Sequence, residues 1–207
     1  MTPLEQILRY KIVAILRGCE PERVPDIADA LVNGGVRLLE VTLNSRDAFE
    51  VIRKLADTMS DRLLVGAGTV TTPEEAEIAI DAGARFVLSP VFDPDTIRVT
   101  KELGAVSIPG AFTATEIMAA WRNGADIVKV FPASIGAAYL SNLRGPLPQI
   151  RLMPTGGVNL HNIREFRAAG AVAYGIGSAL VPAGQETNTE ALERLRLRAI
   201  EYTKMLV

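Results

Sequence analysis

The sequence predicts an α/β fold of parallel strands, because short apolar runs alternate with segments of helical spacing along the whole chain. Glycine precedes most of the apolar runs, as in Asn33-Gly34-Gly35, where a helix needs a left-handed residue to end. Eight strand–helix units closed on themselves make a (β/α)8 TIM barrel. A doubly wound open sheet is the alternative, but the sequence lacks the Gly-rich dinucleotide fingerprint expected after its first strand.

The expected elements begin with an N-terminal helix at 3–10, whose Leu4, Ile7 and Leu8 share a face. The eight strands are expected at 12–17, 36–43, 63–67, 85–88, 105–108, 127–131, 150–153 and 172–176. The helices that follow them are expected at 20–33, around 49–55, and at 73–82, 94–103, 114–123, 137–145, 160–169 and 188–205. Thr72 has the position and chemistry of an N-cap. One domain over residues 1–207 accounts for all of these elements.

Composition restricts the function. The chain has 207 residues, 48% of them hydrophobic, which is enough for one sizeable core. A formal charge of −2 without a basic stripe argues against nucleic acid. The sequence contains no membrane-length apolar run and no signal-peptide pattern, so a cytoplasmic protein is expected. Cys19 and His161 are the only residues of their types, so neither a disulfide nor a His- or Cys-rich metal site is expected, and no cofactor.

A lysine interrupts the apolar strand expected at 127–131. Burial disfavours the charged ammonium of Lys129, and the neutral amine is a nucleophile toward carbonyl carbon. The alternative is a lysine whose stem packs while its head reaches water. The rest of the chain has to decide between these interpretations.

Polar residues recur where the expected strands end, which is the active-site face of a (β/α)8 barrel. They are Arg17, Glu40, Thr42, Asn44, Thr69, Ser89-Pro90, Pro109-Gly110, Lys129, Thr155 and Gly177-Ser178. Alternation along a strand directs Glu40 and Thr42 into the barrel and gives Phe131 the same face as Lys129. A structural pair of Glu40 with Lys129 or Arg17 is the alternative, but a carboxylate and a lysine in one cavity favour function, with Glu40 moving protons. Arg17 is a candidate clamp for a carboxylate or phosphate.

Two glycine-rich loops follow the last two strands, Pro154-Thr155-Gly156-Gly157 and Gly175-Ile176-Gly177-Ser178. Barrels frequently bind phosphate there, since exposed N–H groups face the anion, although tight turns alone also need glycine. Gly66-Ala67-Gly68 is a weaker phosphate loop. Its glycines are expected to permit close approach of the backbone, with Thr69 as a possible substrate contact.

Six segments in order resemble the class I aldolases for 2-keto-3-deoxy-6-phosphogluconate (KDPG) and 4-hydroxy-2-oxoglutarate (KHG). They are Ala14-Ile15-Leu16-Arg17, Leu39-Glu40-Val41-Thr42-Leu43, Gly66-Ala67-Gly68-Thr69-Val70, Val128-Lys129-Val130-Phe131-Pro132, Pro154-Thr155-Gly156-Gly157-Val158 and Gly177-Ser178-Ala179-Leu180. The resemblance implies a Schiff base between Lys129 and the C2 carbonyl, with Glu40 moving protons. It also implies that Arg17 and Thr69 hold the pyruvate end, and that Gly156, Gly157, Gly177 and Ser178 bind the 6-phosphate. Pro90, Phe131 and Thr155 are the further substrate contacts expected.

The same resemblance implies a sugar acid phosphate and pyruvate as ligands, no metal, and a homotrimer. Many gluconate-type relatives have arginine where this chain has Asn44, and Leu43-Asn44-Ser45 is similar to the galactonate branch. Thr155 is similar to the gluconate branch, and cleavage of KDPG to pyruvate and glyceraldehyde 3-phosphate is the expected reaction. The galactonate epimer is the alternative substrate. A non-covalent phosphosugar isomerase or synthase, and a silent barrel that binds a sugar acid phosphate, are the alternative functions.

Overall fold

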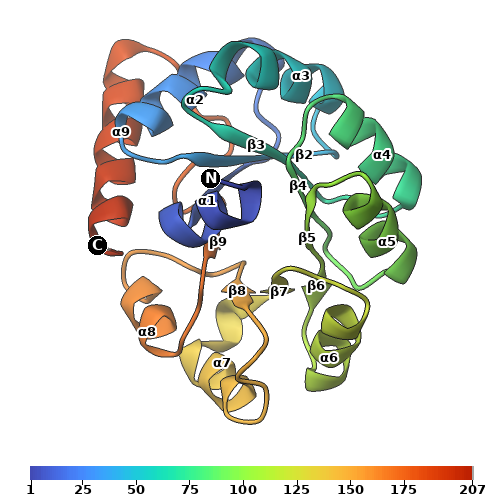
Figure 1. The fold of residues 1–207 in the computed structure, drawn as a ribbon. Coiled ribbons are helices and arrows are strands. Elements are labelled where there is room, and N and C mark those ends of the chain that lie inside the picture. The colour runs from blue at the N-terminus through green and yellow to red at the C-terminus, as the bar shows by residue number, and fades with distance from the viewer. Residues whose placement is uncertain (207) are drawn as a thin grey trace.

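The computed structural model describes residues 1–206 (Figure 1). Its strands are β1 (Ile12–Leu16), β2 (Leu38–Thr42), β3 (Leu64–Gly68), β4 (Phe86–Leu88), β5 (Val106–Ile108), β6 (Gly110–Ala111), β7 (Val128–Val130), β8 (Leu152–Pro154) and β9 (Tyr174–Ile176). Its α-helices are α1 (Pro3–Tyr10), α2 (Val24–Asn33), α3 (Ala48–Met59), α4 (Pro73–Asp81), α5 (Pro94–Glu102), α6 (Ala114–Arg122), α7 (Ala137–Arg144), α8 (Ile163–Ala168) and α9 (Thr189–Lys204). Two 3-10 helices are η1 (Pro21–Arg23) and η2 (Ala133–Ile135).

Every pair of neighbouring strands in these sheets is parallel, as the alternation of strands and helices predicts. One sheet has six strands in the order β5-β4-β3-β2-β1-β9, and a second has three in the order β6-β7-β8. A few contacts join the two sheets at each junction. Thr155 and Gly175 form a bridge at one, and the Asp126 N–H donates to the Ser107 carbonyl at the other. The α/β prediction is therefore confirmed, whereas the hydrogen-bonded strands form a curled six-stranded half-barrel and a smaller sheet rather than one continuous ladder.

The fifth strand predicted at 105–108 corresponds to β5, and a second short strand that was not predicted, β6, follows it across Pro109. Proline has no N–H to donate to a ladder, so regular pairing stops there. The Pro109 carbonyl still accepts from the Lys129 N–H at 2.9 Å, and β6 then pairs with β7. The break is local and keeps the chain beside β7.

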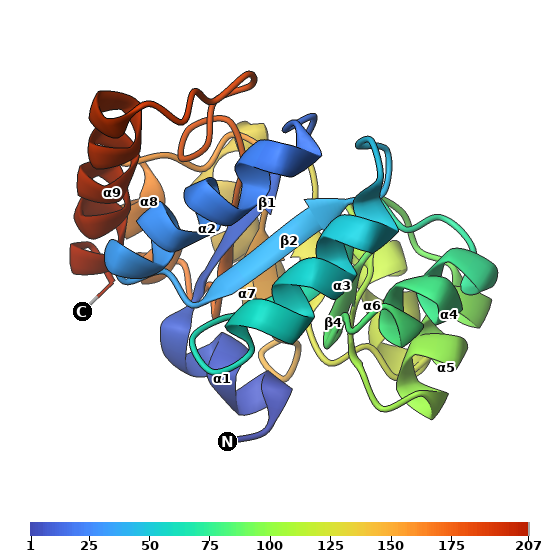
Figure 2. The ribbon, with the colours of Figure 1, turned by 90° about the horizontal axis from the view of Figure 1, so that it is seen from above.

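Side chains alternate between two apolar layers, as predicted. Leu39 and Val41 belong to the layer under the helices, whereas Leu38 belongs to an inner cluster with Val13, Phe86 and Met153. Ile7 of α1 is fully buried in that inner cluster. Helix α1 therefore lies within the arc of strands, with the other helices outside, and closes the end where the strands begin (Figures 1 and 2). The carboxyl ends of the strands lie at the opposite end of the molecule.

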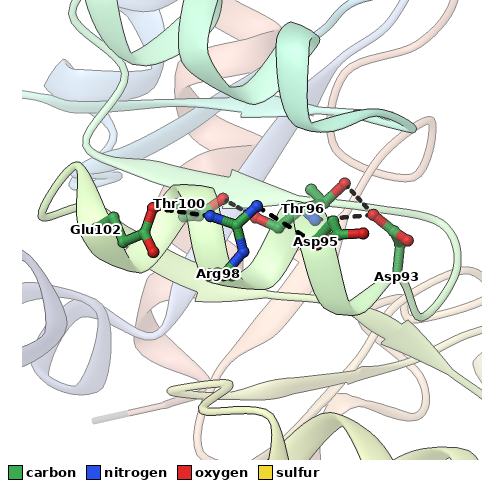
Figure 3. A network of polar contacts seen from close by, with 6 residues as sticks. All are labelled: Asp93, Asp95, Thr96, Arg98, Thr100 and Glu102. Carbon is green, nitrogen blue, oxygen red and sulfur yellow. Dashed lines mark hydrogen bonds and ion pairs between the residues drawn. The ribbon is translucent and has the colours of Figure 1, made fainter.

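Local capping sets several helix starts. Thr72 accepts from the Glu75 N–H, which confirms it as the N-cap of α4. The carboxylate of Asp93 caps α5 by accepting from both the N–H and the hydroxyl of Thr96 (Figure 3). Arg98 of the same helix pairs with Asp95 and Glu102, and Thr100 donates to the Thr96 carbonyl (Figure 3). These ion pairs are exposed to water and contribute little, so the cap is the main local determinant of where α5 begins.

Two predicted helices are shorter than expected. The helix predicted at 20–33 is η1 followed by α2, since Pro25 has no N–H for a helical bond and fits only a first turn. The helix predicted at 160–169 is α8, which starts at Ile163. Asn162 accepts from the Asn159 N–H and Asn159 accepts from the His161 N–H, so side chains hold this entry as a turn.

Candidate active site

The predicted site residues come from the carboxyl ends of strands that run in parallel. Arg17 follows β1, Glu40 lies on β2, and Thr69 follows β3. Lys129 is the central residue of β7, and Thr155 follows β8. Parallel strands end at the same edge, so the fold directs these residues to one end of the molecule, opposite α1.

Lys129 is buried, with 5% of its surface exposed. Its ammonium lies 5.0 Å from the centre of the Phe131 ring, so two residues predicted to share a strand face do so. Burial lowers the pKa of Lys129 from its ordinary value, and the Arg17 charge lowers it further, while Glu40 opposes both. Desolvation dominates, so the neutral, nucleophilic amine is favoured.

Glu40 is 1% exposed, and its pKa is raised by burial against the opposing charges of Lys129 and Arg17. Within residues 1–206 no ion pair joins Glu40 to Lys129 within 4.0 Å, and Glu40 Oε2 has no hydrogen-bond partner. A buried, unpaired carboxyl oxygen costs about 1–3 kcal/mol, and folding alone does not explain its retention. The same environment therefore favours a protonated carboxyl group and an unprotonated amine, which are a proton donor and a nucleophile.

Gly68 makes room for this carboxyl group. A methyl group added to Gly68 would overlap Oε1 of Glu40, and one added to Gly66 would overlap the Phe86 ring. Both glycines are strand residues of β3 and not part of a loop after it. The close approach expected at these glycines is thus made by neighbouring side chains.

Arg17 is exposed and held by two neutral acceptors. Its Nη1 donates to Asn44 Oδ1 at 3.1 Å, and its Nη2 donates to Thr69 Oγ1 at 3.2 Å. Thr69 was expected to contact substrate, and it also orients this guanidinium. Asn44 lay among the strand-end residues of the sequence, but nothing there identified it as a partner of Arg17.

Thr155 is 4% exposed, and its hydroxyl has no partner in the described part of the chain. It pairs with Gly175 across the junction of the two sheets, and a methyl group at position 175 would overlap the Thr155 hydroxyl. Thr155 therefore has a buried, unused hydrogen-bonding group at the same end as Lys129. This is the second orphaned polar atom among the predicted site residues.

The two glycine loops offer unpaired amides. Gly156 and Gly157 have φ values of 80° and 92°, in the left-handed region that favours glycine. The N–H groups of Gly156, Gly157 and Ser178 donate to no acceptor within residues 1–206. The Gly177 carbonyl accepts from the Leu180 and Val181 N–H groups, which turns the chain after β9. Such unpaired donors suit an anion.

Pro90 is the predicted residue with the weakest link to the others. It is half-buried after β4, and its carbonyl lies so close to Gly110 that a methyl group there would overlap it. No hydrogen bond or ion pair in the described part of the chain joins Pro90 to Lys129 or Glu40. Pro90 thus borders β6, and its predicted contact with substrate remains a prediction.

A cavity of about 430 Å³ opens between the loops after β1 and β9. Its walls are formed by Gly18, Cys19, Glu20, Glu22, Arg23, Gly184 and Gln185, and it includes none of the predicted site residues. Burial raises the pKa of the Cys19 thiol there, so the unreactive protonated form is favoured. This cavity adjoins the site through Gly18 but contains no group suited to the chemistry of Lys129.

Residues 1–206 contain no group of three His, Cys, Asp or Glu side chains placed to hold a metal ion. Among the helices that the structure describes, none combines the length and apolarity of a membrane span.

Comparison with known proteins identifies the family. Residues 4–195 match the family described as KDPG and KHG aldolase. The chain is 38% identical over 185 residues to 2-dehydro-3-deoxy-phosphogluconate aldolase of Treponema pallidum, covering 88% of each protein. It is 37% identical over 186 residues to a probable 2-dehydro-3-deoxy-6-phosphogalactonate aldolase of Rhizobium meliloti, covering 89% of this chain and 86% of that protein.

Among solved structures, the fold is similar to KDPG aldolase from Legionella pneumophila, in which pyruvate was captured as a covalent carbinolamine intermediate. The TM-score is 0.83 at 30% identity, over 100% of this chain and 98% of that one. Sequence and structure thus agree over nearly the whole chain, and the protein belongs to the KDPG and KHG aldolase family.

Proposed function

We propose that this protein is a class I aldolase, a carbon–carbon lyase that cleaves KDPG to pyruvate and glyceraldehyde 3-phosphate. The observation that carries the proposal is the buried Lys129, whose pKa is lowered near an unpaired, buried Glu40 with a raised pKa. The names of the Treponema and Legionella relatives support the same reaction.

In the proposed mechanism, the lone pair of Lys129 Nζ adds to the C2 carbonyl, whose oxygen takes a proton to give a carbinolamine. The protonated carboxyl group of Glu40 supplies the proton with which water leaves, and an iminium forms. The Glu40 carboxylate then accepts the proton of the C4 hydroxyl while the C3–C4 bonding pair moves into the iminium. Glyceraldehyde 3-phosphate departs, the remaining enamine is protonated at C3, and water hydrolyses the imine to pyruvate.

The other predicted residues hold the two ends of the substrate in this proposal. Arg17 and Thr69 bind the carboxylate next to the reacting carbonyl, since a guanidinium suits a planar anion. The amides of Gly156, Gly157, Gly177 and Ser178 bind the 6-phosphate. The space between the carboxylate and the 6-phosphate is lined by Pro90, Phe131 and Thr155 in this proposal. Without the phosphate contact the same centre would cleave 4-hydroxy-2-oxoglutarate to pyruvate and glyoxylate.

The gluconate compound is the proposed substrate, and the galactonate epimer is the alternative. Both epimers carry an oxygen at C4 that the buried, unpartnered hydroxyl of Thr155 can bond, so the preference rests on the resemblance of Thr155 to the gluconate branch. The Rhizobium relative is named for the galactonate compound, so both epimers have to be assayed.

We further propose that the half-barrel and the smaller sheet close as one (β/α)8 barrel, with β5 and β6 as two halves of its fifth strand. The links from Ser107 to Asp126 and from Thr155 to Gly175 support closure. The proposal also treats residues 1–207 as a single domain, which acts as a homotrimer in the cytoplasm without a metal or other cofactor.

Turnover of the two epimers tests the function. Pyruvate and glyceraldehyde 3-phosphate are each measured with a coupled dehydrogenase after adding either compound. Equal amounts of both products, faster from the gluconate compound and absent with Lys129→Ala, are expected. A well-folded protein that isomerises or only binds these compounds, without releasing pyruvate, would contradict the proposal.

A further inference from the structure

The guanidinium of Arg17 is oriented by two uncharged side chains that follow different strands. Asn44 belongs to the loop after β2, Thr69 follows β3, and each accepts one hydrogen bond from Arg17. Asn44 is 27 residues from Arg17 in sequence, so the contact depends on the fold and not on local chain geometry.

The backbone on both sides of Arg17 is held by the same loop. The Gly18 N–H donates to Ser45 Oγ at 2.9 Å, and Ser45 Oγ lies 2.9 Å from Thr42 Oγ1. Thr42 Oγ1 in turn donates to the Leu16 carbonyl at 3.2 Å. The hydroxyl proton of Thr42 is donated to the Leu16 carbonyl, so the Ser45 hydroxyl donates to Thr42 and accepts from the Gly18 N–H. Each donor in this series of hydrogen bonds therefore has an acceptor. These bonds hold the backbone of residues 16 and 18 independently of Asn44, whose side chain bonds the guanidinium of Arg17 between them.

The acceptors leave the charge of Arg17 uncompensated. Within the described part of the chain Arg17 makes no ion pair, whereas Arg46 in the same region pairs with Glu20, Glu22 and Asp47. A carboxylate in place of Asn44 would give similar geometry but would neutralise the guanidinium. An amide acceptor orients the cation and keeps its charge available to an anionic ligand.

Thr69 shows that this arrangement is maintained at a cost. Its φ of 59° lies in the left-handed region, which is a genuine outlier for a β-branched residue. Such strain costs about 1–3 kcal/mol and concentrates at functional sites. In this conformation the Thr69 hydroxyl reaches Arg17.

We propose that Asn44 is a positioning residue that holds the charged guanidinium of Arg17 in the orientation needed to bind the carboxylate of the keto acid. The inference rests on the proposed function, in which Arg17 faces that carboxylate. Asn44 acts only through Arg17 in this proposal and takes no part in the proton transfers of Glu40.

The test measures how the rate of adduct formation by cyanoborohydride depends on pyruvate concentration. Asn44→Ala is expected to raise the half-saturating pyruvate concentration about tenfold, the size of one lost hydrogen bond to a charged group, with little change in the saturating rate. Asn44→Asp is expected to restore none of this loss, because it neutralises Arg17. Asn33→Ala, a change at an exposed asparagine on α2, is the matched control and is expected to behave like the unmodified protein.

A double-mutant cycle with Arg17→Ala separates positioning from a general loss of structure. In the Arg17→Ala background, Asn44→Ala is expected to have no further effect on the half-saturating concentration. Additive effects, an unchanged concentration in Asn44→Ala, or full activity of Asn44→Asp would overturn the inference. Failure of the unmodified protein to form any adduct would instead overturn the proposed function, so the two failures are distinguishable.

Discussion

The carboxyl group of Glu40 lies against the backbone of Gly68 on the neighbouring strand, so closely that a methyl group at position 68 would overlap Oε1. Any side chain there would displace the Glu40 carboxyl group, whose Oε2 has no hydrogen-bond partner within residues 1–206. Gly68 thereby determines where Glu40 can be, although it takes no part in the chemistry.

Gly68→Ala is therefore expected to lower kcat by about a hundredfold or more, the usual contribution of a positioned acid–base group. Steady-state kinetics on KDPG check this result. Gly66→Ala is the matched control in the same strand, since its methyl group would overlap Phe86 in the core. It is expected to lower the unfolding free energy by about 1–3 kcal/mol while kcat per folded molecule is kept. Equal kcat in Gly68→Ala and the unmodified protein would be inconsistent with this role.

The pH dependence of imine formation should respond in opposite directions to two substitutions. The rate rises with pH as Lys129 loses its proton, with a midpoint below the ordinary lysine pKa of about 10.4. Glu40 raises the pKa of Lys129, so Glu40→Gln is expected to move the midpoint to lower pH. Arg17 lowers that pKa, so Arg17→Ala is expected to move it to higher pH. Trapping rates from pH 5 to 10 measure both shifts, and shifts of the same sign would refute the electrostatic account.

Burial of the Lys129 amine beside Glu40 is expected to lower the free energy of unfolding. The folded-state pKa of Lys129 is depressed, so the unfolded chain binds more protons between the two values and stability rises with pH through that window. At neutral pH the burial of Lys129 therefore still lowers the free energy of unfolding. The double variant Glu40→Gln/Lys129→Met is expected to be inactive and about 1–4 kcal/mol more stable in urea unfolding. A less stable double variant would show that the pair supports the fold.

The unpartnered hydroxyl of Thr155 predicts an effect on the choice between the gluconate and galactonate epimers. Thr155→Val keeps the side-chain shape and is expected to leave stability equal or slightly higher. It is expected to lower kcat/KM for the gluconate compound about ten- to a hundredfold. Thr155→Ser, which keeps the hydroxyl, is the control, and its kcat/KM should stay closer to that of the unmodified protein. An unchanged ratio of the two epimers in Thr155→Val would remove Thr155 from the specificity argument.

The two glycine loops after β8 and β9 are expected to affect binding of the 6-phosphate and not the reaction at C2. Gly157 has a φ of 92° and lies beside Ser134, so Gly157→Ala shifts an unpaired amide. We expect a KM for KDPG raised about tenfold, from the loss of one hydrogen bond to a charged group, and unchanged adduct formation with pyruvate, which has no phosphate. Loss of both activities would mean that this loop supports the whole site.

The sequence was sufficient for the features that follow from periodicity. Alternation placed Leu38 on the inner face with Glu40, and gave Lys129 and Phe131 one shared face. The extra strand β6 after Pro109 and the delayed start of α8 were missed. The first depends on pairing with β7 across the chain, and the second on a local asparagine turn. The partnership of Asn44 with Arg17 was also missed, since it depends on how closely the ends of β1 and β2 approach each other. Pattern determines which face a residue occupies, whereas the hydrogen bonds of a site depend on tertiary distances.

Reductive trapping with pyruvate and borohydride, followed by peptide mass mapping, tests the central claim most directly. The account predicts a reduced pyruvyl adduct on the peptide that contains Lys129, and no adduct in Lys129→Ala. A folded protein that releases no adduct peptide, or an adduct on another lysine such as Lys101, would contradict the assignment of Lys129 as the Schiff-base residue.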